Sequence, residues 1–319
     1  MRPNRKAARF ELAGKRVWVA GHGGLVGSAI MRRLSNEKCE ILTVVRAEVD
    51  LRRQSQVEQW MDRAEADVVI VAAATVGGIS ANDRYPVDFL YDNLAIETNI
   101  IHSAYQTGVK KLLLLGSSCI YPKMAPQPIP EEAFMTGPLE PTNEWYAIAK
   151  IAGIRLCQAY RQQYGCDFIS AMPTSLYGPG DNFDPAAGHV IPAFISKAHL
   201  AKISGARDIE VWGTGKPLRE FLYVEDAADA LIFLLEHYSQ APHVNIGTGT
   251  EVSITELAKT VSDVVGFSGG LRYLADRPDG TPRKLLECGR MTAMGWKPQT
   301  TLRDGLERTY RWYLDQVLS

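Results

Sequence analysis

The chain has 319 residues, of which 46% are hydrophobic and 22% charged, so we expect a folded globular protein of one large domain or two of ordinary size. Its 35 basic and 36 acidic side chains leave a net charge of −1, which excludes an overall field that would attract nucleic acid or an anionic membrane. The longest apolar run, Val68–Ile79, is interrupted by Thr75 and two glycines and is shorter than the ~20 residues that a membrane helix needs. We therefore expect a small-molecule partner.

The cysteines and histidines indicate no metal site. The five cysteines are odd in number and form no Cys-x-x-Cys motif, and the six histidines show no metal-ligand spacing. Free thiols fit a reducing compartment, so we expect a cytoplasmic protein. The basic stretch at residues 1–6 precedes no apolar segment, and we interpret residues 1–14 as a tail rather than a secretion signal. The cysteines are Cys39, Cys119, Cys157, Cys166 and Cys288.

A glycine-rich loop follows the first predicted strand, Arg16–Ala20, and precedes a helix-compatible run from Ser28 to Leu34. Strand, glycine-rich turn and helix is the order that a dinucleotide site requires. Glycines at such positions let the backbone turn tightly and approach a pyrophosphate at the positive end of the helix. The alternative is a tight turn without a ligand. The predicted cofactor contacts in this loop are Gly21, His22, Gly23, Gly24, Leu25, Val26 and Gly27.

The next predicted strand, residues 40–45, ends at Arg46. An NAD enzyme often places an acid there for the ribose hydroxyls, whereas an NADP enzyme places a cation for the additional phosphate. Arg46 therefore favours NADP(H). Glu48 and Asp50 lie close enough in the sequence to keep NAD as an alternative.

Strands and helices continue to alternate through the first half. Val68–Val71 is a continuous apolar strand, as expected for a strand buried on both faces of a parallel sheet, and the small residues 72–74 leave room for a cofactor. A helical pattern runs from Leu94 to Thr107, and Lys111–Leu115 is the next strand. This order predicts an α/β protein with a doubly wound parallel sheet, that is, a Rossmann fold.

Tyr146 and Lys150 lie four residues apart in a helical segment. Four residues are about one helical turn, so both side chains leave the same face. An ammonium beside a phenol favours the phenolate and lowers its pKa from about 10, which makes Tyr146 a candidate acid or base. The spacing alone is common by chance. Together with the glycine-rich loop and a serine-rich turn at residues 117–118, it resembles the extended short-chain dehydrogenase/reductase superfamily.

Five longer segments resemble the GDP-L-fucose synthase family, whose members are NADPH-dependent epimerase/reductases. The segments are Gly116–Pro122 (GSSCIYP), Glu140–Lys150 (EPTNEWYAIAK), Met172–Gly178 (MPTSLYG), His189–Pro192 (HVIP) and Val211–Phe221 (VWGTGKPLREF). The resemblance extends in matching order from about Lys15 to Trp312. It implies conversion of GDP-4-keto-6-deoxy-D-mannose to GDP-L-fucose by 3,5-epimerisation and 4-keto reduction.

Two alternatives to this activity remain. A relative could perform only one of the two steps on a GDP-hexose. A catalytically silent NADPH-binding regulator is a different class, but it would be expected to have lost the pair formed by Tyr146 and Lys150, which this chain retains.

The serine-rich turn carries the candidate groups for carbon chemistry. Ser117 lies where superfamily members carry a residue that hydrogen-bonds a substrate oxygen, and Cys119 lies where nucleotide-sugar dehydratases carry a base that removes a carbon-bound proton. A thiol can be that base, because its pKa falls near a cation. The alternative is a buried structural cysteine. The resemblance makes Cys119 the base and His189 the acid, so the candidate catalytic residues are Ser117, Cys119, Tyr146, Lys150 and His189.

The resemblance also implies the remaining contacts. A smaller α/β substrate-binding lobe would be formed mainly by residues 176–319, with residues of about 220–260 returning to an NADP-binding domain at 15–175. Substrate contacts are implied at Lys197, Trp212, Arg219, Asp279 and Lys284. Further cofactor contacts are implied at Arg46, Asp50, Leu51, Leu115, Gly116, Ser117, Ser118, Lys150, Pro173, Thr174, Ser175, Leu176 and His189.

Two further expectations follow from the same resemblance. Many relatives carry an arginine at the position of Gly23, so a cation that would contact the cofactor phosphates is missing here. By family analogy we expect a homodimer built from the helices that contain residues 95–107 and 147–163.

Overall fold

The computed structural model describes residues 9–185, 188–277 and 279–317. The basic stretch at residues 1–6 lies outside them. The end of the predicted tail packs against the protein instead: Leu12 is buried, and the backbone N–H of Phe10 donates a hydrogen bond of 2.8 Å to the carbonyl oxygen of Glu236.

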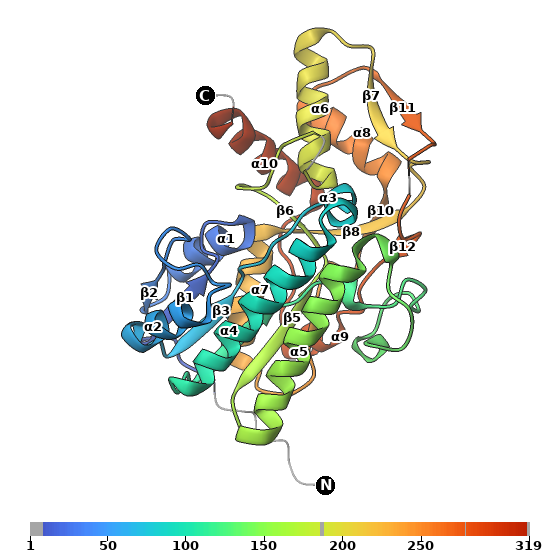
Figure 1. The fold of residues 1–319 in the computed structure, drawn as a ribbon. Coiled ribbons are helices and arrows are strands. Elements are labelled where there is room, and N and C mark those ends of the chain that lie inside the picture. Colours follow the sequence, from blue (N-terminus) through green and yellow to red (C-terminus); the bar gives the residue numbers. More distant parts are fainter. Residues whose placement is uncertain (1–8, 186–187, 278, 318–319) are drawn as a thin grey trace.

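The first lobe is organised around a six-stranded sheet, the lower body in Figure 1. The strand order is β2-β1-β3-β4-β5-β9, and every neighbouring pair is parallel. The α/β, doubly wound prediction is therefore confirmed. The strands are β1 (Arg16–Ala20), β2 (Glu40–Leu42), β3 (Val68–Val71), β4 (Lys111–Leu115), β5 (Phe168–Pro173) and β9 (Val244–Ile246).

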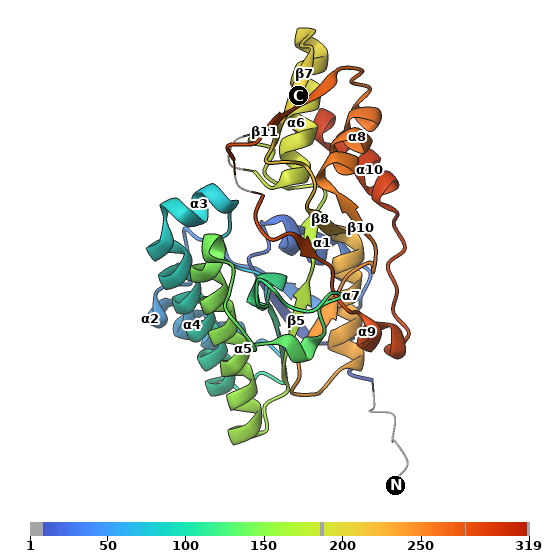
Figure 2. The same ribbon diagram turned by 90° about the vertical axis from the view of Figure 1, so that its right-hand side faces the viewer.

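Helices cover both faces of this sheet, as Figure 2 shows edge-on. One apolar core joins the sheet to α1, α7 and α9, and a second joins its other face to α2, α4 and α5. The first group comprises α1 (Leu25–Leu34), α7 (Val224–His237) and α9 (Gly289–Met294); the second comprises α2 (Gln54–Ala64), α4 (Asn93–Gln106) and α5 (Glu144–Tyr164). The short helices α3 (Ile79–Arg84) and η1 (Asp88–Asp92) connect β3 to α4.

The second lobe has its own apolar core, built around α6, α8 and α10 and the strands beside them. Strand β8 pairs with β10, β12 and β6, and β7 pairs with β11. Helix α8 begins with the predicted capping box, in which the side chains and backbone of Ser253 and Glu256 bond reciprocally. The elements are β6 (Ser175–Tyr177), α6 (Val190–Ser204), β7 (Asp208–Trp212), β8 (Leu218–Tyr223), β10 (Glu251–Ser253), α8 (Ile254–Val265), β11 (Gly270–Leu274), β12 (Arg283–Lys284) and α10 (Leu302–Gln316).

The predicted strand at residues 40–45 is shorter than expected. Strand β2 ends at Leu42 because it lies at the edge of the sheet and pairs only with the first three residues of β1. Val45, beyond that pairing, is 48% exposed. In the described part of the chain, no helix combines the length and apolarity that crossing a membrane requires.

Candidate active site

The glycine-rich loop is shaped for close backbone approach. Gly21 has φ of 88°, and a Cβ atom there would lie 2.5 Å from the backbone nitrogen of Ala73. Gly27 packs so closely under the carbonyl oxygen of Gly21 that a side chain would not fit. Helix α1 begins after Gly24 without a side-chain cap, so its first N–H groups are not bonded by a capping side chain. These features fit the pyrophosphate of a dinucleotide.

Open space surrounds the middle of this loop. Gly23 is exposed, and a Cβ atom there would meet no atom within 4 Å. The missing arginine therefore does not reflect a steric restriction. His22, Leu25 and Val26 are partly buried in the same loop.

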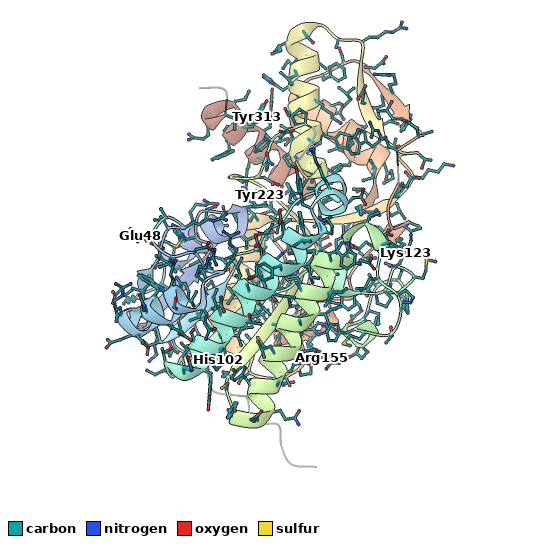
Figure 3. The ribbon with its side chains drawn as sticks, viewed as in Figure 1. Glu48, His102, Lys123, Arg155, Tyr223 and Tyr313 are labelled. Atoms are coloured by element: carbon teal, nitrogen blue, oxygen red, sulfur yellow. The ribbon has the colours of Figure 1, made fainter. Side chains whose placement is uncertain are left out.

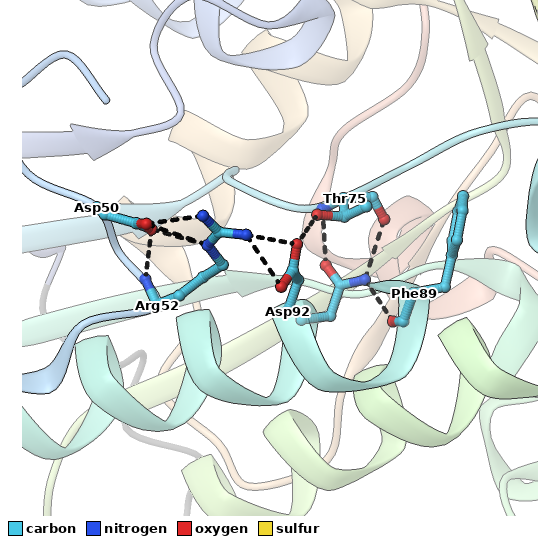
Figure 4. A network of polar contacts seen from close by, with 6 residues as sticks. Asp50, Arg52, Thr75, Phe89 and Asp92 are labelled. Atoms are coloured by element: carbon cyan, nitrogen blue, oxygen red, sulfur yellow. Dashed lines mark hydrogen bonds and ion pairs between the residues drawn. The ribbon is translucent and has the colours of Figure 1, made fainter. Parts of the chain in front are cut away.

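Arg46 and Asp50 differ in whether other residues of the chain bind their side chains. Arg46 is exposed and has no hydrogen bond or ion pair with another described residue. Asp50 is held by Arg52, whose Nη2 lies 2.8 Å from Asp50 Oδ2, and this arginine lowers the pKa of the carboxyl to about 2. Arg52 also pairs with Asp92 at 3.2 Å (Figure 4). Arg46 is thus the group of this pair that is available to a ligand.

The same network continues toward the centre of the molecule. Figure 4 shows Asp92 next to Thr75, in the loop after β3. Asn93 bonds both backbone groups of Thr75 and the carbonyl oxygen of Phe89, whose ring meets the Tyr146 ring edge-on at 6.5 Å. This network joins the loop after β2 to the neighbourhood of the Tyr146 phenol.

Eight of the other predicted cofactor residues lie at or just after the carboxyl ends of β4 and β5, the edge where open α/β sheets bind ligands. Leu51, before α2, accepts a hydrogen bond of 3.0 Å from Asn99. Thr174 already forms hydrogen bonds within the chain: its backbone N–H donates to the carbonyl oxygen of Ile246, and its hydroxyl donates to the carbonyl oxygen of Glu220. The residues at this edge are Leu115, Gly116, Ser117, Ser118, Pro173, Thr174, Ser175 and Leu176.

Tyr146 and Lys150 share one face of α5, as predicted. The Lys150 ammonium lies 5.6 Å from the centre of the Tyr146 ring and donates a hydrogen bond of 2.9 Å to the carbonyl oxygen of Leu115, at the end of β4. It also forms an ion pair of 2.8 Å with Glu97 of α4. Sequence reasoning missed Glu97, because a glutamate within a helical pattern ordinarily faces solvent.

The electrostatic expectation for Tyr146 was wrong in its net direction. Burial raises the pKa of the phenol to about 12, although the Lys150 ammonium lowers it. The charges of Cys119 and Glu97 also raise this pKa. Tyr146 is therefore protonated at neutral pH, as a proton donor must be.

Ser117 and Cys119 lie in the turn that follows β4. Ser117 precedes the short helix η2 (Ser118–Ile120), and its hydroxyl accepts a hydrogen bond of 3.4 Å from the backbone N–H of Cys119. The Cys119 side chain is 6% exposed and interacts electrostatically with both Tyr146 and Lys150. The structure thus brings four of the five candidate catalytic residues into one cluster.

The thiol of Cys119 is more basic than expected. Burial raises its pKa, and the nearby ammonium groups of Lys284 and Lys150 only partly oppose this effect. A thiol with a raised pKa holds its proton more tightly at neutral pH, but its thiolate is a stronger base.

His189 lies apart from this cluster, immediately before α6 in the second lobe. Its side chain is exposed, and Nδ1 lies 3.4 Å from Oδ1 of Asp181, whose hydrogen bond raises the pKa of the imidazole. A raised pKa enlarges the fraction of imidazolium at neutral pH, which suits a proton donor. The structure pairs His189 with Asp181 rather than with Cys119.

The residues predicted to hold a nucleotide sugar belong to the second lobe. Trp212, at the end of β7, is 38% exposed, and two cations lie over its ring: Lys197 at 5.5 Å and Arg277 at 5.3 Å from the centroid. Arg277 had no signal in the sequence. An exposed aromatic face flanked by cations suits a base that carries phosphates.

Arg219 and Lys284 are register partners on the parallel strands β8 and β12. Burial lowers the pKa of both groups, and the Arg219 charge lowers that of Lys284 further. Two partly buried cations side by side fit an anionic group such as a diphosphate. Asp279 is already engaged, because its carboxylate accepts two hydrogen bonds of 2.8 Å from Thr214. It holds the turn after β7.

One pocket connects the two sets of residues. Cys119, Asn143 and Lys284 line it, together with Ser118 and parts of the loop at 121–140. Figure 3 shows Lys123 on this loop and Tyr223 where the two lobes meet. The side-chain oxygen of Asn143 is buried without a hydrogen-bond partner among the described residues. Asn143 is a further residue that the sequence did not single out.

Three comparisons with known proteins identify relatives of this chain. Residues 17–247 match the model of the NAD dependent epimerase/dehydratase family. The chain is 58% identical over 308 residues to GDP-L-fucose synthase of Sinorhizobium fredii, covering 97% of this chain and 98% of that protein. It is 59% identical over 303 residues to GDP-L-fucose synthase 1 of Arabidopsis thaliana, covering 95% and 94%. A crystal structure of a GDP-L-fucose synthetase from Naegleria fowleri bound to NADP superimposes with a TM-score of 0.90 at 29% identity, covering 98% of each chain.

Proposed function

The chain belongs to the NAD dependent epimerase/dehydratase family, and on that basis we propose that it converts GDP-4-keto-6-deoxy-D-mannose to GDP-L-fucose. The reaction inverts carbons 3 and 5 of the sugar and reduces carbon 4 with NADPH. One observation carries the proposal: Cys119 lies in the same buried cluster as Tyr146, Lys150 and Ser117. A plain ketone reductase has no use for a carbon base beside its proton donor.

The cluster supplies the groups for ketone reduction and for removal of the carbon-bound protons, and His189 of the second lobe supplies the acid for epimerisation. Ser117 and Tyr146 hydrogen-bond the 4-keto oxygen, which acidifies the two neighbouring C–H bonds and stabilises the enolate. Cys119 removes the proton from carbon 3 or carbon 5, and His189 delivers a proton to the opposite face of the same carbon, so each inverted carbon loses one proton and gains one. NADPH, when bound along the glycine-rich loop, supplies the hydride for carbon 4. Tyr146 then protonates the oxygen on that carbon, with Lys150 holding its charge close to the phenol.

The substrate would lie between the lobes. We assign residues 15–175 mainly to the cofactor and residues 176–319 mainly to the nucleotide sugar. Trp212 would cover the base, and the partly buried cations Arg219 and Lys284 would neutralise the diphosphate. Lys197 would hold the Trp212 ring in place, and Asp279 would hold the turn after β7 through Thr214.

Incubation of the protein with NADPH and GDP-4-keto-6-deoxy-D-mannose tests the proposal, with the product stereochemistry read by NMR. GDP-L-fucose is the expected product. A 6-deoxy sugar with unchanged configuration at carbons 3 and 5 would identify a reductase, and an inverted 4-keto sugar without NADPH consumption would identify an epimerase. Absence of any reaction would favour the silent regulator.

The enzyme is expected to prefer NADPH to NADH, and Arg46→Ala is expected to narrow that preference by roughly 10-fold or more. The reason is that Arg46, in the loop after β2, is exposed and forms no hydrogen bond or ion pair with another described residue, and one charged hydrogen bond contributes roughly 1.5–3 kcal/mol. The measurement is kcat/KM with each cofactor. Arg63→Ala, which removes an exposed cation from the end of α2, is the matched control. Equal use of both cofactors by the native protein would contradict the prediction.

Gly23→Arg is expected to tighten NADPH binding by roughly 5- to 30-fold. The open space around Gly23 accepts a side chain, and a guanidinium there gains a charged contact with the cofactor phosphates at some cost in side-chain entropy. The Kd follows from quenching of tryptophan fluorescence. Gly23→Ala serves as the control and should bind like the native protein. Unchanged or weaker binding by the arginine variant would show that the phosphates lie elsewhere.

We also propose a homodimer built on α4 and α5. These helices lie side by side in Figure 1, and their exposed surface carries an aromatic group in which Tyr105 and Tyr164 stack at 4.3 Å. Tyr164 is 50% and Tyr105 36% exposed, so the two rings form a contiguous exposed apolar surface of the kind that a partner subunit can cover. The five free cysteines fit a cytoplasmic, reducing location.

A further inference from the structure

A carboxylate is buried directly behind the Lys150 ammonium. Glu97 of α4 is 1% exposed, and its Oε1 lies 2.8 Å from Nζ of Lys150, which is 2% exposed. Apart from this ion pair, neither oxygen of Glu97 has a hydrogen-bond partner among the described residues. Among the described residues, Lys150 is thus the one group with which the Glu97 carboxylate forms an ion pair.

Helix α5 leaves room for this carboxylate. Gly153 lies one turn after Lys150, and a Cβ atom there would collide with Oε2 of Glu97. Glycine destabilises the interior of a helix relative to alanine, so its presence here has a packing reason. Buried ion pairs often contribute little net stability, because both charges lose their hydration. Stability alone therefore does not account for Glu97.

We propose that Glu97 is a positioning residue, which fixes the Lys150 ammonium between the Leu115 carbonyl and Tyr146 and keeps the Tyr146/Lys150 pair fully protonated at neutral pH. This inference rests on the proposed function, in which Tyr146 donates a proton to the reduced carbonyl. Glu97 acts through Lys150 and does not touch the substrate.

The charges around the pair support this assignment. Lys150 faces Glu97 from α4, Tyr146 from its own helix and Cys119 from η2, and Glu97 is the only carboxyl group of the three. Burial favours loss of the charge on Lys150, and Glu97 is the largest influence that retains it, so the pKa of the ammonium is raised. Glu97 also faces the buried thiol of Cys157, and Lys284 faces Cys119.

Replacing Glu97 by glutamine should make proton loss from the Tyr146/Lys150 pair easier, whichever of the two side chains loses the proton. In the native site, loss of one proton from the Tyr146/Lys150 pair leaves a buried net negative charge. With glutamine in place of Glu97, the same loss converts a buried cation into a neutral site. Proton loss is therefore easier in the variant, whether it occurs at Tyr146 or at Lys150.

The test is the pH profile of ketone reduction. In Glu97→Gln, kcat/KM for NADPH-dependent reduction should begin to fall about 1 to 3 pH units lower than in the native enzyme, because a nearby charge shifts a pKa by about that amount. A merely structural residue would lower the rate equally at every pH. Glu131→Gln exchanges another buried carboxyl, which is not among the groups that act on Tyr146 or Lys150, and should keep the native profile.

Two further variants keep the test decisive. Gly153→Ala places a methyl group against the Glu97 carboxylate, improves helix propensity, and should move the profile in the same direction even if Glu97→Gln folds poorly. Glu97→Asp retains the negative charge and should restore part of the native profile. Native-like profiles in both Glu97→Gln and Gly153→Ala would overturn the inference.

A measurement without substrate separates this inference from the proposed function. Protein labelled with ¹³C at tyrosine Cζ and lysine Cε reports the titration of both groups, and Tyr146→Phe and Lys150→Met identify the two signals. Whichever of the two groups loses its proton first as the pH rises should do so at a pH at least about one unit lower in Glu97→Gln than in the native protein. Identical titrations would overturn the role of Glu97. A shifted titration in a protein that does not reduce the 4-keto sugar would leave that role standing and refute the proposed function.

Discussion

Cys119→Ser is expected to abolish the exchange of solvent deuterium into carbons 3 and 5 of the 4-keto sugar. In D₂O the native enzyme should incorporate deuterium even without NADPH, because enolisation needs no hydride. A serine hydroxyl is a far weaker acid than a thiol and does not supply the anion, so the exchange rate should fall by about 10² or more. Ser117, Tyr146 and Lys150 remain in place, and they should still support reduction to an unepimerised 6-deoxy sugar.

The pH dependence of the deuterium exchange provides a second test of Cys119 as the base. Burial raises the pKa of Cys119, so the thiolate fraction grows as the pH rises through the neutral range, and native exchange should accelerate accordingly. His189→Asn is the companion variant: proton removal by Cys119 should survive in part, whereas inversion should fail. If Cys119→Ser exchanges and epimerises as fast as the native enzyme, Cys119 is a packing residue and the carbon base lies elsewhere.

Tyr146→Phe is expected to lower ketone reduction by about 10² or more while leaving the fold and NADPH binding intact. The phenol is the proton donor to the 4-oxygen, and its pKa of about 12 keeps it protonated throughout the neutral range. The loss should therefore be the same from pH 6 to about pH 9. Single-turnover oxidation of NADPH measures the step directly.

Tyr238→Phe provides the matched control for that variant. Tyr238 is 4% exposed, and its hydroxyl donates one hydrogen bond of 2.6 Å to Pro242, remote in the sequence from the cluster. Its loss should change stability and leave the reduction rate unchanged. A folded Tyr146→Phe protein that reduces at the native rate would show that the proton comes from another group.

Local patterns predicted the first lobe well. Residues 68–71 and 112–115 are continuous apolar runs, and each lies in a buried central strand, β3 or β4, that has the predicted limits. The glycine-rich loop and the one-turn spacing of Tyr146 and Lys150 depend on short segments of backbone, so the sequence was sufficient to predict both. Strand β2 was shorter because edge pairing, rather than β propensity, sets its end.

Contacts between distant segments could not be predicted in this way. Glu97 and Lys150 are more than fifty positions apart, and their ion pair depends on how α4 packs against α5. The directions of the Tyr146 and Cys119 pKa shifts depend on burial, which a list of neighbouring charges does not contain. Asp50 and Asp279 had the right chemistry for ligand contacts, but other residues of the chain already use their carboxylates.

The path of the chain between the lobes limits how this protein can be divided. After β6 enters the second lobe, α7 and β9 return to the first, β10 and α8 lie in the second, and α9 returns once more. A fragment ending at residue 175 would lack β9, leave the edge of β5 unpaired and expose the face that α7 covers. The cofactor half is thus not a module that can be excised and transplanted as one continuous segment.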